Sequence, residues 1–361
     1  MKKLFLITIF LFVAVLRSNA YTGSDSIILG NKYIETESLS VDAETSDEAD
    51  ASIKEYITDR YAIISDKWLK RIISSRNPKI SSFSDTSGKT ENIFIGASYQ
   101  VPECFLVDTA KILWELNIPE FKSRLYSLYK SDTIYIDTWN NVIGTIKDKT
   151  YAGNFEGYRV RNYPSWKDPE KPESTPTPPG PKNPLGLFVV HYDENSLRYF
   201  HGTNKPDLIY SANRSLSHGC VRNDNNNIAK MKEFLIKRVI KSADLSSWLS
   251  SKKTLSYDFK DIDKFPVRII YRTFTVFDEG EGPFIEFYKD IYNYRKGNYS
   301  TKYNNPDNVI LSTKENIISE YRKYIKGGLS DEKLSKIIDY AIENLDFYER
   351  YYFKDLEKLV E

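Results

Sequence analysis

The stretch Ser-His-Gly-Cys-Val-Arg at residues 217–222, together with His201 upstream, holds most of the chain's few reactive side chains. The 361-residue sequence has only two cysteines and three histidines, yet one cysteine and two histidines fall within twenty residues of each other. A free cysteine has a pKa of about 8.5 and needs a nearby base or positive charge to become a thiolate at neutral pH. His201, His218 and Arg222 are the candidates, so this stretch predicts that Cys220 is a nucleophile.

Gly219 separates His218 from Cys220, and a residue without Cβ lets the backbone turn sharply and lets a substrate carbonyl approach. Backbone N–H groups at such a turn can donate to an oxyanion. A cysteine nucleophile, an imidazole base and backbone donors together indicate acyl-transfer chemistry. Two imidazoles remain candidates for the base: His218, adjacent in the chain, and His201, which can return across a neighbouring strand.

Two other interpretations of these side chains are considered. His191, His201, His218 and Cys220 could in principle bind zinc, although their spacing matches no common zinc pattern. We expect His191 instead to be a core histidine of a β-sheet. Two cysteines in an exported protein could also form a Cys104–Cys220 disulfide. The imidazoles and the guanidinium around Cys220 argue against this, and the apolar neighbours of Cys104 predict a small buried core residue.

The composition is that of a folded globular protein, with 40% hydrophobic and 14% aromatic residues. Residues 1–20 predict a secretory signal peptide, because a basic start is followed by an apolar run from Leu4 to Leu16 and by the small-residue site Ser-Asn-Ala at 18–20. The run is shorter than the roughly 20 residues that span a bilayer, so no stable membrane span is expected after cleavage. Removing the signal's three basic residues leaves 48 of the 51 Lys and Arg against 50 Asp and Glu, and this near-neutral balance does not indicate nucleic-acid binding.

The first part of the mature chain is predicted to be helical. Residues 21–50 are rich in acidic residues, Ser and Thr and predict a solvated linker. Apolar residues at helical spacing predict a helical N-terminal region over residues 51–130, with helices that include 106–116 and 121–129.

From residue 131 the apolar period changes to that of strands, which predicts a β-rich domain over residues 131–298. Eight of the 15 prolines lie at 164–184, and we expect this stretch to be a long loop within the domain, over its active site. Residues 310–361 are predicted to be helical again. The individual elements expected in the β-rich domain are a hairpin over 133–146 with its turn at Asn140-Asn141, strands at 187–192, 197–200 and 265–277, and a helix at 227–241.

His201-Gly202-Thr203-Asn204 followed by the stretch at 217–222 closely resembles the signature of the L,D-transpeptidase (YkuD-type) catalytic domain. Residues 183–186, 265–271 and 284–292 also look like segments of this family's larger periplasmic members. The resemblance covers residues 131–298. It implies an α+β fold, in which a mostly-β catalytic domain is flanked by helical N-terminal and C-terminal regions.

By position, the resemblance implies that Cys220 is the nucleophile and His201 the general base. The carbonyl of Gly202 would orient the imidazole of His201 through its other ring nitrogen. His218 would shape the pocket and polarise the thiol, and the amides of Gly219 and Cys220 would form the oxyanion hole.

The remaining expected site residues bind substrate. Arg222 is expected to bind a substrate carboxylate, because a fixed guanidinium fork suits one. Ser217, Thr203 and Asn204 complete the expected substrate-binding set. Asn223 departs from the family's pattern, since many members carry an apolar residue there, and this puts local packing in doubt rather than catalysis.

The resemblance implies an exported enzyme of the periplasm or cell wall that acts on peptidoglycan stem peptides and needs no metal or other cofactor. Cys220 would attack the carbonyl of the third stem residue, a diamino acid, and release the terminal D-alanine. The side-chain amine of a second stem would resolve the thioester and form a 3→3 cross-link. Water as the acceptor would give an L,D-carboxypeptidase instead. A related cysteine hydrolase of stem peptides and a non-catalytic wall-binding protein are the remaining alternatives.

Overall fold

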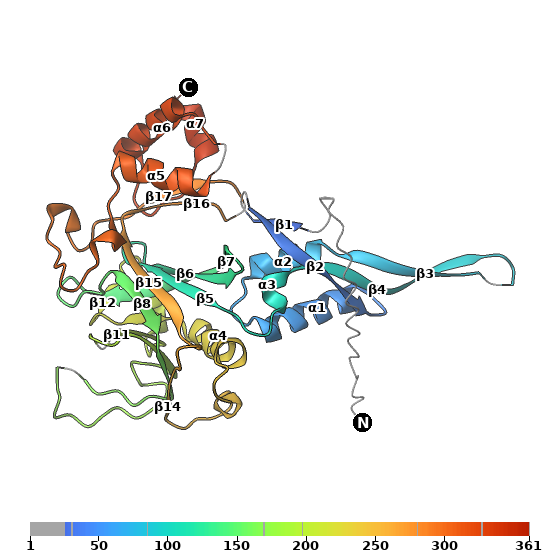
Figure 1. Ribbon diagram of the computed structural model, residues 1–361, viewed down its shortest axis with the longest axis horizontal. Helices are drawn as coiled ribbons and strands as arrows, with labels where there is room; N and C mark the ends of the chain where they lie inside the picture. Colours follow the sequence, from blue (N-terminus) through green and yellow to red (C-terminus); the bar gives the residue numbers. More distant parts are fainter. Residues whose placement is uncertain are drawn as a thin grey trace.

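The computed structural model describes residues 26–29, 32–84, 86–168, 170–196, 198–279, 281–325 and 328–360. The molecule is elongated, with a β-rich centre, a C-terminal group of helices on one side and an N-terminal part that ends in a long two-stranded arm (Figure 1). The predicted signal peptide, residues 1–20, lies outside the described residues. Among the helices in the described ranges, none has both the length and the apolar character needed to cross a membrane.

The N-terminal part is a four-stranded sheet with three helices. Its strands run in the order β1-β2-β4-β3, with bounds β1 Ser26–Leu29, β2 Lys32–Asp42, β3 Asn77–Ser84 and β4 Thr90–Pro102. The helices are α1 Ser46–Arg60, α2 Asp66–Ser74 and α3 Glu103–Leu106. Helix α1 begins where the Thr45 hydroxyl accepts a hydrogen bond from the Glu48 amide, which satisfies one of the free N–H groups of the first turn.

Residues 32–42, which were expected to belong to a linker, form strand β2 instead. The strand pairs antiparallel with β4, from Thr36 opposite Pro102 to Asp42 opposite Gly96. Leu39 and Val41 pack against the hydrophobic core, while the polar residues between them face solvent. Only one face of this strand is covered, so every second residue can be polar, and the acidic Ser-rich composition concealed the period of two.

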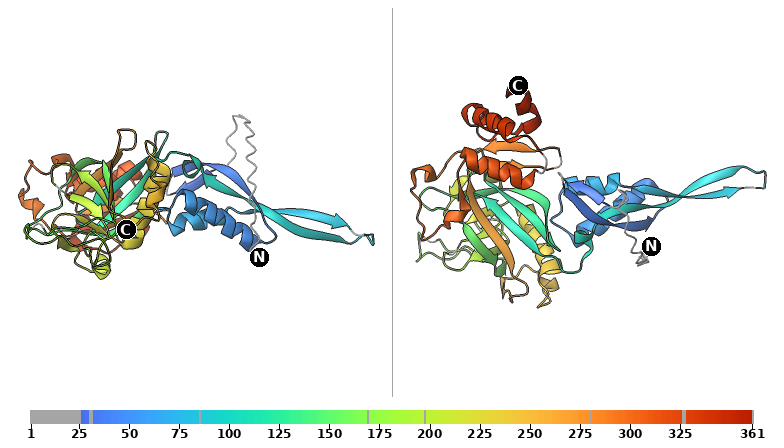
Figure 2. Two further views of the ribbon diagram at one scale, coloured as in Figure 1. Left: turned by 90° about the horizontal axis from the view of Figure 1, so that it is seen from below. Right: turned by 45° about the horizontal axis from the view of Figure 1, so that its top comes forward.

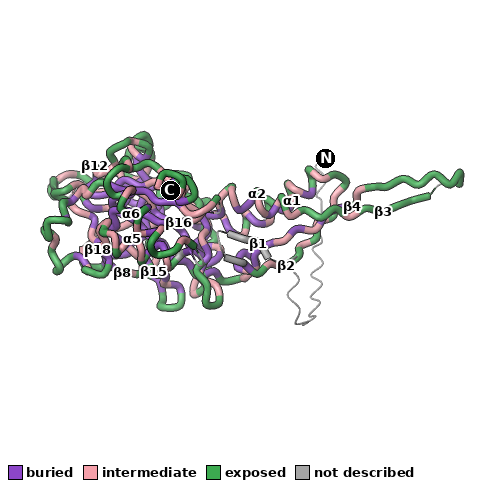
Figure 3. Tube along the Cα trace, turned by 90° about the horizontal axis from the view of Figure 1, so that it is seen from above, coloured by how far each residue is buried: buried purple, intermediate pink, exposed green. Residues whose placement is uncertain are grey.

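The arm consists of β3 and the paired first half of β4, and it projects away from the rest of the molecule in every view (Figure 2). Its apolar side chains Ile80, Phe83, Ile93 and Ile95 are all exposed. The arm contrasts with the centre of the molecule, where the chain is mostly buried (Figure 3).

The central sheet has twelve strands and positions the motif residues at 201–204 and 217–222. Ten strands run in the order β14-β9-β10-β11-β13-β7-β6-β5-β15-β18, while β12 pairs with β7 and β8 pairs with β15. Their bounds are β5 Ile112–Asn117, β6 Lys122–Tyr129, β7 Asp132–Gly144, β8 Gly153–Gly157, β9 Arg159–Asn162, β10 Phe188–Asp193, β11 Arg198–His201, β12 Ser215–Ser217, β13 Val221–Asn223, β14 Leu255–Asp258, β15 Phe265–Arg272 and β18 Val309–Ile310.

Two predicted helices are strands of this sheet. Residues 106–116 and 121–129 contain β5 and β6, which pair antiparallel with each other. Every residue of β5 is buried. Both faces of this strand are covered, and even its polar residues Glu115 and Asn117 are buried. The period of a short, mostly apolar run of this kind does not distinguish it from a buried helix.

The predicted hairpin over residues 133–146 is also wrong, because β7 continues through Asn140-Asn141 as one strand. Asn141 is buried, and its side-chain amide donates to Asn223 Oδ1 at 2.8 Å on the neighbouring strand β13. The asparagine pair therefore lies inside the sheet with its hydrogen bonds satisfied, rather than in a turn.

The other predicted elements are found close to their expected places. The strands at 187–192 and 197–200 are β10 and β11. The predicted strand at 265–277 is divided into β15 and β16, which lie in different sheets. The predicted helix at 227–241 is α4 Asn225–Phe234, continued by the π-helical segment Leu235–Val239. Short 3₁₀ segments lie at Pro206–Tyr210, Ser246–Trp248, Tyr294–Lys296 and Pro306–Asn308.

The C-terminal part combines a small sheet with three helices. The strands are β16 Phe274–Phe277, β17 Phe284–Phe287 and β19 Tyr351–Tyr352, and the helices are α5 Lys314–Tyr324, α6 Asp331–Asn344 and α7 Phe353–Val360. Their buried side chains, including Ile317, Leu334 and Ile338, form a hydrophobic cluster separate from the main core. The predicted fold class is confirmed: a mostly-β centre has helices at both ends (Figure 1).

The proline-rich stretch joins two neighbouring strands of the central sheet. Residues 163–187 connect β9 to β10, which pair antiparallel. The buried side chain of Asn183 ties the loop together by donating to the Pro164 carbonyl at 2.8 Å. This stretch is therefore a long loop within the β-rich part, as predicted.

Candidate active site

Strand pairing brings the two halves of the motif together. Strands β11 and β13 are parallel neighbours, with Phe200 opposite Val221 and His201 opposite Arg222. Phe200 and Val221 are buried in the main core. Because successive side chains of a strand point to opposite faces, His201 and Arg222 lie on the other face of the sheet. By the same alternation, Cys220 lies with Arg222.

The segment from Ser217 to Cys220 forms a tight turn before β13. Gly219 has a φ of +99°, a conformation that favours glycine. A Cβ atom at this position would also lie only 2.7 Å from Arg198 Nε. The Ser217 hydroxyl closes the turn, because it donates to the Cys220 carbonyl and accepts from the Gly219 amide at 3.2 Å.

The turn is held from behind by residues that the sequence analysis did not single out. Thr150 Oγ1 donates to the Gly219 carbonyl at 2.9 Å and accepts from the Gly144 amide at 3.0 Å. The Tyr292 hydroxyl donates to the Gly144 carbonyl at 2.7 Å. Thus Tyr292, from the segment 284–292 that resembles the family, holds the end of β7 against which the motif turn packs.

The thiol of Cys220 is half-buried. Burial raises its pKa, and this is opposed by hydrogen bonds from the backbone and the hydroxyl of Tyr199 and by the charges of Arg198 and Arg222. The net shift is upward, so the resting side chain is a thiol at neutral pH. The groups that stabilise a thiolate are nonetheless already in place.

The imidazole of His201 is buried, with only 3% of its surface exposed. Burial, followed by the charge of Arg222, lowers its pKa to about 3, while backbone hydrogen bonds to Gly202 and Pro184 oppose the shift. The Nδ1 atom has no hydrogen-bond partner among the described residues. The ring is therefore neutral at neutral pH, is held by backbone carbonyls and has a free nitrogen that can accept a proton.

Two guanidinium groups flank the thiol without a carboxylate partner among the described residues. Arg222 is half-buried on β13, and burial lowers its pKa while the Cys220 thiolate would raise it. Arg198 donates through Nε to the Lys149 carbonyl at 2.9 Å and lies over the ring of Tyr151 at 4.0 Å. These positive charges favour both a thiolate and a carboxylate ligand.

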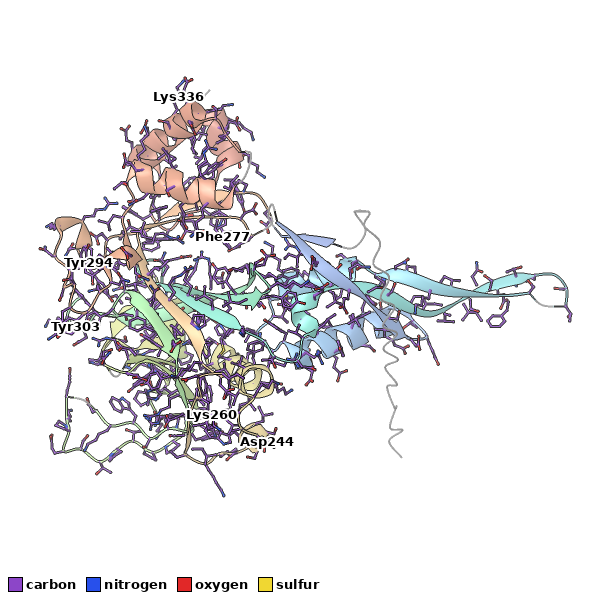
Figure 4. The ribbon with its side chains drawn as sticks, in the orientation of Figure 1. Asp244, Lys260, Phe277, Tyr294, Tyr303 and Lys336 are labelled. Carbon is purple, nitrogen blue, oxygen red and sulfur yellow. The ribbon has the colours of Figure 1, made fainter. Side chains whose placement is uncertain are left out.

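The ring of Tyr151 links Arg198 to an exposed tyrosine, Tyr303. It stacks on Tyr303 with a centroid distance of 4.9 Å. Tyr303 and Tyr294 lie at the same end of the central sheet (Figure 4). The Arg198 guanidinium is thus positioned by an aromatic side chain on one side and a backbone carbonyl on the other.

His218 is placed differently from His201. It is 56% exposed, and its Nε2 atom lies 3.5 Å from Glu170 Oε1 in the proline-rich loop. The loop therefore reaches the motif turn at this point. The roles expected for His218, shaping the pocket and polarising the thiol, remain predictions.

The segment after His201 is fixed to the start of α4. Asn225 accepts from the Thr203 amide and donates to the Thr203 carbonyl, both at 2.9 Å. A Cβ atom at Gly202 would lie 2.6 Å from the side-chain oxygen of Asn225, Oδ1, so there is no space for a side chain. Asn204 donates to the Lys182 carbonyl at 3.2 Å and so holds the proline-rich loop.

Thr203, Asn204 and Ser217 thus have structural hydrogen bonds, and their expected contact with substrate remains a prediction. Asn223, which departs from the family's pattern, is fully buried in the sheet. Its side chain accepts from Asn141 at 2.8 Å and faces the His201 carbonyl at 3.4 Å. The departure is therefore accommodated by a second asparagine on β7.

Neither of the two alternatives, a disulfide and a metal site, is found among the described residues. No disulfide joins Cys104 and Cys220. In the described part of the chain, no group of three or more His, Cys, Asp or Glu residues could hold a metal ion. His191 is 6% exposed and lies in β10 of the central sheet, so its predicted burial is confirmed.

A separate cavity of about 400 Å³ lies between α2, the start of β7 and α4. Its lining includes Asp66, Asp137, Lys230 and Glu279, and none of the motif residues. Burial raises the pKa of Asp137 to about 6. The cavity is a feature of the junction between the N-terminal part and the central sheet rather than of the site around Cys220.

Tyr199 is the site residue that the sequence analysis most clearly missed. It lies two positions before His201 on the same strand and therefore on the same face. That spacing, Tyr-x-His, was the available signal. Without the pairing of β11 with β13, nothing in the sequence indicated that its hydroxyl reaches Cys220.

Residues 116–240 match the model of the YkuD family, the L,D-transpeptidase catalytic domain. A search of curated proteins found no match.

Solved structures similar to this chain include several L,D-transpeptidases. One from Mycobacterium smegmatis is 13% identical with a TM-score of 0.27, over 57% of this chain and 86% of that chain. L,D-transpeptidase 3 from Mycobacterium tuberculosis is 8% identical with a TM-score of 0.26, over 68% of this chain and 95% of that chain. The helical cell shape determining protein Pgp2 from Campylobacter jejuni is 14% identical with a TM-score of 0.25, over 45% of this chain and 49% of that chain, so about half of that protein is spanned.

The matched segment begins in β5, before the predicted boundary at residue 131, and includes both halves of the motif. The part of this chain that is similar to the YkuD family, the L,D-transpeptidase catalytic domain, is residues 116–240.

Proposed function

We propose that this protein is an exported peptidoglycan L,D-transpeptidase that forms 3→3 cross-links through a thioester on Cys220. The observation that supports it most is the shared sheet face of Cys220, Arg222 and the neutral, buried His201. The family of the matched domain supports peptidoglycan as the substrate.

In the first half of the proposed reaction, Cys220 Sγ attacks the carbonyl of the third stem residue while its proton passes to His201 Nδ1. A tetrahedral oxyanion forms, and amides at the Gly219 turn donate to it. The bond to the terminal D-alanine then breaks, His201 returns the proton to the leaving amine, and a thioester remains on Cys220.

A neutral resting pair suits this sequence of proton transfers. Because the pKa of the thiol is raised and that of His201 is lowered to about 3, the thiol keeps its proton until the substrate arrives. Proton transfer would then accompany attack on the carbonyl, as in general-base catalysis.

In the second half, the side-chain amine of a neighbouring stem attacks the thioester and His201 accepts its proton. The bond between the acyl carbon and Cys220 Sγ then breaks, and His201 returns the proton to the sulfur. The products are a 3→3 dimer and the Cys220 thiol. If water attacks instead, the product is a tripeptide, and the enzyme is an L,D-carboxypeptidase. Arg222 is proposed to hold a carboxylate of the donor near the reacting bond.

We further propose that the protein works outside the cytoplasm, in the periplasm or cell wall. The predicted signal sequence at residues 1–20 and the peptidoglycan-acting family both support this. A fractionation experiment with the full chain, comparing the precursor mass with that of the exported form, tests the predicted cleavage after Ala20.

The test of the main proposal is product analysis with a defined tetrapeptide stem. The full mature chain is incubated with the stem, and the products are separated and weighed. We expect 3→3 dimers and free D-alanine, with a transient mass increase of one acylated tripeptide on the peptide that contains Cys220. Tripeptide without dimers would identify a carboxypeptidase, and no change in the stem, with sacculus binding retained, would favour a wall-binding protein.

A further inference from the structure

The polar face around Cys220 extends across two more strands. Val190 on β10 pairs with Phe200, and Val160 on β9 pairs with Val190; both valines are fully buried in the same core. Their neighbours in each strand therefore point to the opposite face, the one that carries His201 and Cys220.

Two rows of side chains follow from this register. In the first row, Tyr199 pairs with His191 and His191 pairs with Arg159. In the second row, His201 pairs with Val189 and Val189 pairs with Arg161. The site around Cys220 thus continues toward β9 as a surface that carries one imidazole and two guanidinium groups.

His191 is a buried polar group with an unused atom. Its side chain lies between two tyrosine rings, 4.8 Å from that of Tyr199 and 5.9 Å from that of Tyr158. Its Nε2 atom is buried and has no hydrogen-bond partner among the described residues. A buried polar atom without a partner destabilises the fold, so such an atom in a native site indicates a ligand.

The two arginines of β9 differ in their partners. Arg159 forms an ion pair with Asp258 on β14. Arg161 forms no ion pair with any described residue, and its guanidinium makes one long hydrogen bond of 3.4 Å to the Ser165 carbonyl. The charge of Arg161 affects the pKa of both His191 and Tyr199, whereas that of Arg159 affects His191 but not Tyr199.

We propose that Arg161 and the Nε2 atom of His191 form a second carboxylate-binding subsite, separate from the carboxylate site proposed at Arg222. An unpaired guanidinium beside an imidazole N–H is a donor set that a carboxylate satisfies. The proline-rich loop joins β9 to β10, the two strands that carry Arg161 and His191. The same loop contacts His218 beside Cys220 through Glu170. This subsite rests on the proposed function, because it binds a distant part of the same stem peptide.

The spacing of the strands selects which carboxylates can reach this subsite. His191 lies two strands from Cys220, and strands are about 4.8 Å apart, so the separation is roughly 10 Å. An extended peptide covers at most about 3.5 Å per residue. The carboxylate of the leaving residue is too close to the attacked carbonyl. Two sources remain: a carboxylate at the end of the third residue's side chain, and a carboxylate that the second residue carries outside the peptide backbone.

The test combines changes in the enzyme with changes in the substrate. Three tetrapeptide donors are used: one with all carboxylates free, one amidated at the third side chain and one amidated at the second residue. The enzymes are the wild type, Arg161→Gln and the matched control Arg159→Gln, which loses the same charge from the same strand. kcat and KM are measured for each combination.

We expect one amidated donor to lower the wild-type kcat/KM by roughly 10- to 100-fold, mostly through KM, because a charge-assisted hydrogen bond is lost. Arg161→Gln should show the same loss with the free donor and no further loss with that amidated donor. Arg159→Gln should lower kcat/KM much less and show no coupling to either amidated donor, because the charge of Arg159 is already paired with Asp258. The amidated donor that shows this coupling identifies the source of the carboxylate.

His191→Phe provides a second test that does not depend on charge. Phenylalanine fills the same space between the two tyrosine rings but has no Nε2 atom. We expect KM for the free donor to rise roughly tenfold without a loss of thermal stability. A histidine that only packs would leave KM unchanged in this variant.

Several outcomes would overturn the subsite. One is an Arg161→Gln enzyme that matches Arg159→Gln with every donor. Another is that the loss of kcat/KM caused by Arg161→Gln multiplies with the loss caused by amidation for both amidated donors. Such independent effects would show no coupling between Arg161 and either carboxylate. Failure of the proposed function looks different: the wild type itself would release no D-alanine from any of the three donors, which would remove the basis of both proposals.

Discussion

Cys104 and Cys220 are both withdrawn from solvent, yet only one has the surroundings of a nucleophile. Burial raises the pKa of Cys104 to about 12 and also raises that of Cys220. Around Cys220 the shift is opposed by a tyrosine hydroxyl and by the charges of Arg198 and Arg222. Around Cys104 the shift is opposed by hydrogen bonds from Ser127 and from the backbone instead. The comparison shows that stabilising neighbours on adjacent strands, rather than exposure alone, distinguish the two thiols.

The largest expected effect is that of removing each thiol in turn. Cys220→Ala should lower turnover of a tetrapeptide stem by at least roughly 10⁴-fold, because no thioester can form. Cys104→Ala should retain activity and instead lower the unfolding temperature, since it leaves a cavity in the core. Product analysis and thermal unfolding are the measurements. An acyl adduct on the Cys220→Ala protein, seen by intact mass, would contradict the assignment.

The next effect concerns the two imidazoles near Cys220. His201→Ala should slow acylation by roughly 10²- to 10⁴-fold, the usual cost of losing a general base. His218→Ala should cost less, because this side chain is largely exposed and lies against Glu170. Single-turnover acylation rates measure both. The reverse order of effects would make His218 the base.

The pH dependence of alkylation separates the two thiols directly. The pKa of Cys220 is raised, so its thiolate is a minor form at neutral pH, and the alkylation rate should increase about tenfold per pH unit below that pKa. Cys104, with a pKa of about 12, should remain unreactive in the native protein up to pH 9. Iodoacetamide labelling followed by peptide mass analysis gives both rates. Equal labelling of the two thiols in the folded protein would mean that their surroundings do not differ as described.

A smaller change is expected from Arg222→Gln. Removing this charge takes away one of the groups that oppose burial, so the pKa of Cys220 should rise further and alkylation at pH 8 should slow by roughly tenfold. The same substitution removes a charge that lowers the pKa of His201. Arg159→Gln, on the distant strand β9, is the control. An unchanged alkylation rate in Arg222→Gln would show that its charge does not act on the thiol.

The candidate site was predicted from the sequence to the extent that its residues are neighbours in the chain. Cys220, Gly219 and Arg222 lie in one short segment, and the turn at Gly219 has the positive φ that its sequence suggested. Tyr199, Arg198 and Thr150 come from other segments and act through strand pairing and side-chain reach. No local pattern carries that information.

The same reasoning explains the errors in the fold. The N-terminal helix at 46–60 and the C-terminal helices have caps and an apolar stripe, which are local signals. Strand β5 is covered on both faces, and β2 on one face only, so the partner elements rather than the local period decide their form.

The sequence by itself determined the reactive group, because a cysteine, two histidines, a glycine and an arginine close together in the chain define a chemistry wherever they fold. Only the tertiary structure decided which side chains surround the thiol. The parallel pairing of β11 with β13 puts His201 opposite Arg222 and Tyr199 beside Cys220. Hydrogen bonds between strands set that register, and a shift of one residue would turn these side chains to the core face.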